Sequence, residues 1–159
     1  MARAVGQYVA AFARLEQELY ISFGKVLGTD YNGAMQLLGH IQSFSTRLTA
    51  IKTFLPATAL TTDDKKTGTV VFGIAKECNN FRNKLIHGQW GLTDAGQLRL
   101  VPWATSTTKK SKAEAINAKL IDDRRTLDLD RCVFINRMFQ EGQPLPPPPF
   151  RPEPTIVPK

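Results

Sequence analysis

The feature that most constrains the fold is a repeated spacing of apolar residues at steps of three or four. From Ala4 to about Leu27, this spacing places seven apolar side chains on one stripe: Val5, Val9, Phe12, Leu15, Leu19, Phe23 and Val26. A stripe with this period is typical of an amphipathic α-helix that buries one face. Gly28 follows directly and suits the left-handed position that ends many helices. The sequence therefore predicts a first helix over residues 4–27.

The cleanest repeat of the same kind lies near the middle of the chain. Its members step by 3, 4, 3 and 4 and are Val71, Ile74, Cys78, Phe81 and Leu85. Upstream, Thr61 to Asp64 carry hydroxyl and carboxylate oxygens that can accept the free N–H groups of a helix start. Gly88 stands where a C-terminal cap belongs. We predict a helix that runs from about Thr61 to His87.

A less regular pattern between these two helices predicts another one. It begins near Asp30 and Asn32 and runs to about Leu55, where Pro56 ends it. The apolar positions are Met35, Leu38, Ile41, Leu48 and Ile51, and the pattern is blurred at Phe44 and Ser45. We predict one helix over this stretch.

The second half of the chain has a different pattern. Residues 90–103 nearly alternate between apolar and polar around Asp94 to Gly96, which predicts a two-stranded β-hairpin. Residues 105–112 are polar and basic and are expected to form a loop. Residues 113–121 fit either a helix or a strand that completes the hairpin. A last helical stripe spans Leu127 to Phe139, with Thr126 or Asp128 as its cap and Gly142 at its end.

Together these patterns predict a mainly α protein: an up-and-down bundle of four to five helices, with a small β-hairpin inserted after the third helix. The chain has 159 residues, a length suited to one core, and we assign this domain to residues 1–142. Eight of the ten prolines fall in residues 143–159, which predicts an extended or disordered tail. Such a tail acts as a linker or docks into an aromatic groove.

Composition narrows the class of partner. The formal net charge is +7 and the pI about 9.7, a balance that attracts polyanions such as RNA and that also favours solubility. Cys78 and Cys132 lie on the apolar side of predicted helices and are expected in the core. The sequence contains no secretory leader, long apolar span, phosphate-binding loop or metal-binding motif. We expect a cytoplasmic protein with no membrane association, no cofactor and no metal.

Residues 81–90 carry the side chains best suited to chemistry, in the order Phe-Arg-Asn-Lys-Leu-Ile-His-Gly-Gln-Trp. This segment resembles the signature of the HEPN superfamily (higher eukaryotes and prokaryotes nucleotide-binding), in which four to six residues separate an Arg from a His and a polar residue often follows the Arg. Arg82, Asn83 and His87 match it residue by residue. The resemblance covers roughly residues 4–140, because the long first helix, the second helix and the motif-bearing helix follow the family's order.

The resemblance implies a homodimer in which two copies of the motif line one composite site. It implies a metal-independent endoribonuclease that leaves 2′,3′-cyclic phosphate ends, in a toxin–antitoxin or phage-defence role, with an antitoxin or regulatory protein as a further partner. It also allows an alternative, a catalytically silent module that binds nucleotide, nucleic acid or a partner protein. A third reading is a helical interaction protein unrelated to HEPN, whose working part is the Pro-rich tail.

The residue types fit the implied chemistry. The imidazole of His87 can act as general acid or base, while Arg82 offers a planar fork for phosphate oxygens. Asn83 can fix an imidazole tautomer or hold a ribose hydroxyl, and it lies four residues from His87, nearly on the same helix face. Arg82 is about 140° around the helix from His87. The alternative is a purely structural role, in which Arg82 and Asn83 are solvated and His87 only caps the helix.

Other basic and aromatic residues are secondary candidates. Lys84, Lys109, Lys110 and Lys112 are predicted to attract RNA phosphates. Trp90 and Trp103 could stack on bases, but we expect Trp90 in the core and leave Trp103 open. His40 has no Arg at the matching distance, so we interpret it as a packed or surface histidine.

Overall fold

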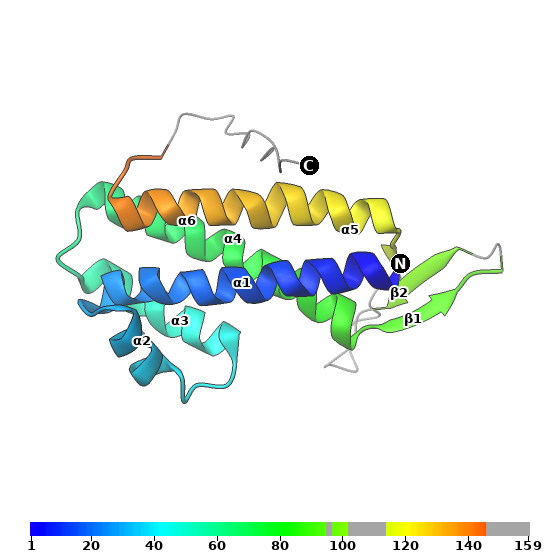
Figure 1. The fold of residues 1–159 in the computed structure, drawn as a ribbon, viewed down its shortest axis with the longest axis horizontal. Coiled ribbons are helices and arrows are strands. Elements are labelled where there is room, and N and C mark those ends of the chain that lie inside the picture. Colours follow the sequence, from blue (N-terminus) through cyan, green and yellow to red (C-terminus); the bar gives the residue numbers. More distant parts are fainter. Residues whose placement is uncertain (95–96, 102–113, 146–159) are drawn as a thin grey trace.

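Three long helical rods lie side by side in the computed structural model, which describes residues 1–94, 97–101 and 114–145 (Figure 1). The first two rods are α1 (Ala2–Leu27) and α4 (Thr62–His87), which run in opposite directions. The third joins α5 (Ala118–Arg124), a π-helical turn (Arg125–Asp130) and α6 (Arg131–Glu141). The predicted mainly α bundle is confirmed.

Two shorter helices pack on this frame. Helix α2 (Tyr31–Leu38) contacts α1, and α3 (Phe44–Phe54) contacts both α1 and α4 before a 3-10 turn (Leu55–Ala57) leads into α4. The start of α3 thereby comes to lie beside the middle of α4, although the two are far apart in sequence.

The core forms where the apolar stripes of the three rods meet. Phe72 of α4 packs between Phe23 of α1 and Phe139 of α6, with both pairs of ring centroids 5.8 Å apart. Cys78 and Cys132 are fully buried, as predicted. Burial raises the pKa of the Cys78 thiol to about 12, so this sulfur behaves as a small apolar group.

The predicted helix ends near glycine and threonine are confirmed. Thr61 caps α4 by accepting a hydrogen bond from the N–H of Asp64 at 3.1 Å. Gly28 and Gly142 end α1 and α6 in the left-handed conformation, with φ of 69° and 71°. Gly88 ends α4 in an extended conformation instead, and it must be glycine because an added Cβ would lie 2.5 Å from the backbone carbonyl oxygen of Lys84 and 2.5 Å from the Cδ1 atom of Leu100.

The predicted single helix over residues 32–55 is wrong. The chain breaks after α2 at Gly39 and starts again at α3, where the hydroxyl of Ser43 accepts a hydrogen bond from the N–H of Thr46. A serine that caps the backbone in this way competes with continuation of a helix. The blurred pattern at Phe44 and Ser45 marks this new start.

The predicted start of the last helix, at Thr126 or Asp128, is also wrong. The rod begins nine residues earlier, where Asn117 caps α5 by accepting a hydrogen bond from the N–H of Leu120 at 2.8 Å. The π-helical turn inserts extra backbone between α5 and α6 and shifts the phase of the apolar stripe. Leu127, predicted to be part of that stripe, is therefore 61% exposed.

The predicted hairpin is present and is extended by a third strand. Strands β1 (Gln89–Leu92), β2 (Leu98–Val101) and β3 (Glu114–Ala115) form an antiparallel sheet in that order. The ambiguous residues 113–121 thus contain both a short strand and the start of α5. The prediction that Trp90 lies in the core is wrong: its side chain is 37% exposed, and its indole N–H donates to the carbonyl of Leu85.

Several predicted features lie outside the described residues: Trp103, the whole basic loop at 105–112 with its three lysines, and the tail from residue 146 onward. The last described residue, Leu145, packs against the core three positions beyond the predicted domain boundary at 142. No helix in the described part of the chain is long and apolar enough to cross a bilayer.

Lys25 ties the ends of the three rods together. Its ammonium group donates to the carboxylate of Asp64 at 2.7 Å and to the backbone carbonyl of Phe139 at 2.5 Å. The hydrogen bond from Lys25 holds the pKa of the Asp64 carboxyl below its ordinary value, and the Thr61 hydroxyl acts in the same direction. The ion pair is mostly shielded, with 22% and 13% of the two side chains exposed.

We predict that Asp64→Asn lowers the free energy of unfolding by about 1–2 kcal/mol at neutral pH, because a shielded charge-assisted hydrogen bond is lost. Since the folded-state pKa of Asp64 is depressed, its contribution is complete above the unfolded-state pKa and disappears as pH falls through the folded-state value. Urea denaturation at a series of pH values checks this. Asp63→Asn is the matched control, because the Asp63 and Lys66 side chains are 71% and 68% exposed and should contribute little. An equal loss in both variants would contradict the assignment.

Candidate functional site

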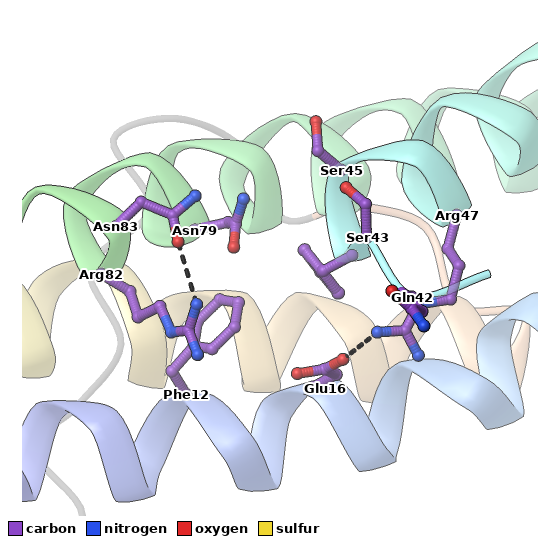
Figure 2. Close-up of a pocket in the computed structure, with 10 residues that line it drawn as sticks. Phe12, Glu16, Gln42, Ser43, Ser45, Arg47, Asn79, Arg82 and Asn83 are labelled. Atoms are coloured by element: carbon purple, nitrogen blue, oxygen red, sulfur yellow. Dashed lines mark hydrogen bonds and ion pairs between the residues drawn. The ribbon is translucent and has the colours of Figure 1, made fainter. Parts of the chain in front are cut away.

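A polar pocket opens where α1, α3 and α4 meet, and it contains two of the three motif residues. Its volume is about 210 Å³, far more than the ~15 Å³ that one ordered water needs. Figure 2 shows α4 presenting Asn79, Arg82 and Asn83 toward Phe12 and Glu16 of α1 and toward the first turn of α3. The lining residues are Phe12, Glu16, Gln42, Ser43, Phe44, Ser45, Arg47, Asn79, Arg82 and Asn83.

Arg82 is held in place without an acidic partner. Its guanidinium carbon lies 5.9 Å from the centroid of the Phe12 ring, and one terminal nitrogen donates to the side-chain oxygen of Asn83 at 3.0 Å. The Nε atom is buried and has no acceptor, and no carboxylate lies within ion-pairing distance among the described residues. A partly buried cation without a counter-ion is costly, so this side chain is poised for an anionic ligand.

Arg47, on the opposite wall, is already paired with a carboxylate, although its Nε atom, like that of Arg82, has no hydrogen-bond partner among the described residues. Its terminal nitrogens donate to the carboxylate of Glu16 and to the hydroxyl of Tyr20, and its guanidinium lies against the rings of Tyr20 and Phe44. The Arg47 side chain is only 11% exposed and that of Glu16 is 28% exposed. This pair therefore joins α3 to α1 and cancels most of the negative charge of Glu16 within the pocket.

Asn79 and the start of α3 supply further polar groups. Asn79 is 4% exposed, and its side-chain amide has no hydrogen-bond partner among the described residues. Across the pocket, Ser43 caps α3, which leaves the backbone N–H groups of Phe44 and Ser45 without acceptors among the described residues. The positive end of the α3 dipole adds to the charge of Arg82.

His87 lies outside this pocket. It is exposed in the last turn of α4, eight residues and just over two turns beyond Asn79. The structure thus brings Arg82 and Asn83 together and places His87 one turn further along, at the surface. Lys84 is half-buried on α4. His40 is exposed in the turn after α2, which agrees with its interpretation as a packed or surface histidine.

Sequence reasoning missed Asn79 and the α3 side of the pocket. Asn79 could have been noticed, because it is a polar residue four positions before Asn83 and directly follows Cys78 of the apolar stripe. Ser43 and Arg47 had no such signal, since their approach to α4 depends on the unpredicted break between α2 and α3. Among residues 1–94, 97–101 and 114–145, no three His, Cys, Asp or Glu side chains gather into a metal-binding group.

Comparisons with models of known families, with curated proteins and with solved structures return no match to this chain.

The two arginines should respond differently to neutralisation. We predict that Arg47→Met lowers the free energy of unfolding by about 2–3 kcal/mol, because Glu16 loses its partner in a shielded site. Arg82→Met should change it by less than about 0.5 kcal/mol or raise it, because a strained, unpaired cation is removed while the aliphatic packing on Phe12 remains. Urea denaturation in chloride buffer without phosphate makes the comparison. A large destabilisation in Arg82→Met would show that Arg82 is structural.

Proposed function

We propose that this protein is a HEPN-like, metal-independent endoribonuclease in which Arg82, Asn83 and His87 act on RNA. The observation that carries the proposal is the guanidinium of Arg82, which is partly buried, fixed by Phe12 and Asn83, and without a carboxylate partner. Such a group favours a phosphate oxygen, to which a guanidinium binds through two parallel N–H donors. The net charge of +7 supports attraction of a polyanion to the surface.

The proposed reaction needs two proton transfers and one site of charge stabilisation. The 2′-oxygen attacks the adjacent phosphorus and loses its proton, while the bond from phosphorus to the 5′-oxygen breaks and that oxygen gains a proton. The products are a 2′,3′-cyclic phosphate and a 5′-hydroxyl. An imidazole can serve at either step, and a guanidinium neutralises the charge that builds on the phosphorane. Asn83 orients Arg82 through their shared hydrogen bond.

Each chain supplies only one such imidazole, because the other histidine, His40, lies on a different element. One His87 cannot be both proton acceptor and proton donor in the same step. We therefore propose a homodimer in which two copies of the α4 exit line one cleft. Three exposed apolar side chains that lie close to His87 in the sequence support this, and we propose them as the contact patch: Ile86 is 41% exposed, Trp90 37% and Leu92 72%.

Trp90 links this patch to the motif helix. Its indole N–H donates to the carbonyl of Leu85 at 3.2 Å, so the ring lies against the last turn of α4, which also carries Ile86 and His87. Trp90 and Leu92 are two residues apart on β1 and share one face of the strand. Exposed apolar side chains grouped in this way are typical of an interface between proteins.

A catalytically silent RNA-binding or nucleotide-binding module is the second candidate. The observation that favours it is the position of His87, which does not line the pocket that holds Arg82 and Asn83. In that case the pocket would bind phosphate without turnover. Wild-type protein that binds RNA and leaves it intact would support this candidate.

We predict that His87→Ala slows cleavage of a single-stranded RNA at least about 100-fold, the usual contribution of a general acid or base. Wild-type cleavage should persist in a metal chelator and give ends that carry a cyclic phosphate. The matched control is His40→Ala, which changes the other, exposed histidine and should leave the rate unchanged. Equal rates for wild type and His87→Ala would remove His87 from the mechanism.

We predict that Ile86→Glu converts the dimer to a monomer, because a charge placed in a desolvated apolar patch opposes association. Sedimentation velocity measures the change, and cleavage should fall with it because each site needs two chains. Leu37→Glu is the control, since Leu37 is 62% exposed on α2, away from the patch. A wild-type protein that sediments as a monomer at assay concentration and still cleaves RNA would contradict the composite site.

A further inference from the structure

We infer that the pocket between the start of α3 and the polar face of α4 is a phosphate subsite, which binds a backbone phosphate of the RNA close to the one that is cleaved. Its donors are the amide of Asn79, the guanidinium of Arg82 and the backbone N–H groups of Phe44 and Ser45. The binding of phosphate follows from the pocket itself. Its assignment to an RNA strand rests on the proposed function.

Asn79 is the side chain that points most directly to a ligand. The residue is 4% exposed and lines the pocket, and no hydrogen bond joins its amide to another described residue, although an amide shielded in this way normally forms hydrogen bonds. Figure 2 shows the amide beside Asn83, on the pocket side of α4 and across from the first turn of α3. A ligand oxygen in the pocket would accept the hydrogen bond that the protein does not provide.

The charge distribution selects an anion. Arg82 brings a positive charge with no counter-ion, and the α3 N-terminus directs two free N–H groups and the positive end of its dipole at the same space. Glu16 is the one carboxylate that lines the pocket, and Arg47 pairs with it. The remaining charge is positive, and the donors converge from two helices, which suits a phosphate with oxygens on several sides.

The position of the pocket suits an extended strand. Arg82 lies five residues and Asn79 eight residues before His87 on α4, so Asn79 is about 12 Å from His87 along the axis. A phosphate held near Asn79 and another near His87 would therefore be separated by about two nucleotides of backbone. In the proposed enzyme, Arg82 lies between these two positions.

The test measures binding of inorganic phosphate by isothermal titration calorimetry and by the rise in melting temperature at constant ionic strength, with chloride as the reference salt. Wild type should bind phosphate, and Asn79→Leu should weaken binding about tenfold or more, because a hydrogen bond to a charged group is lost. Asn79→Leu should still fold, since it replaces an unpaired buried amide with an apolar group of similar size. Asn79→Asp, which puts a negative charge in the pocket, should abolish binding.

Two further variants separate a binding site from a merely structural pocket. Glu16→Gln should tighten phosphate binding about fivefold, because it removes the one nearby negative charge and releases Arg47. Arg137→Met, which removes an exposed charge on α6, should leave the affinity unchanged. Absence of phosphate binding by wild type, or equal affinity in Asn79→Leu, would overturn the subsite.

Binding measurements with RNA distinguish failure of the phosphate subsite from failure of the proposed nuclease function. A 2′-O-methylated RNA, which cannot form a cyclic phosphate, and adenosine 5′-monophosphate are compared as ligands. Weaker binding of the RNA in Asn79→Leu, with adenosine 5′-monophosphate held no more tightly than inorganic phosphate, supports a backbone subsite. Tight binding of the mononucleotide, with no effect of Asn79→Leu on RNA, overturns the assignment to RNA. Cleavage of RNA by the wild type without any binding of phosphate would overturn the subsite and would still support the proposed nuclease function.

Discussion

The packing of α4 against α1 is the interaction on which the site depends. Tyr8 donates its hydroxyl to the carbonyl of Cys78 at 3.2 Å and meets the edge of the Phe81 ring, with centroids 5.1 Å apart. One turn along α1, Phe12 supports the guanidinium of Arg82. Because α1 fixes this stretch of α4 on its apolar side, Asn79 faces the pocket beside α3, while Glu77 and Asn80 are exposed. The core therefore determines where the polar face points.

The two arginines of the pocket differ in whether a carboxylate compensates their charge. Arg47 has a carboxylate and a phenol as partners, so it gains little from a ligand and joins two helices. Arg82 has an aromatic ring and an amide, which hold its position but leave its charge uncompensated. A site built from a fixed cation and unpaired donors is preorganised, because binding does not require the side chains to be ordered again. The α3 N-terminus adds backbone N–H donors whose positions are also fixed before binding.

Most of the fold could be predicted from the sequence, because the stripes of α1 and α4 repeat regularly and Thr61, Gly28 and Gly142 mark helix ends. The break before Ser43 and the π-helical turn could not, since local capping and an inserted residue change the phase of a pattern without removing it. The same limit applied to the site. Arg82, Asn83 and His87 share one segment and were visible as a motif. The pocket around Asn79 exists only because the break places α3 beside α4.

A contact between Arg82 and an RNA phosphate would appear in the salt dependence of the association constant for RNA. The association constant of a 2′-O-methylated single-stranded RNA is measured over a range of salt concentrations for wild type, Arg82→Met and Arg137→Met. Each phosphate contact contributes about 0.7 to the slope of log K against log salt for a single strand. We expect the slope for Arg82→Met to be smaller by about that amount and the slope for Arg137→Met to be unchanged. Equal slopes for Arg82→Met and wild type would contradict a contact between Arg82 and RNA phosphate.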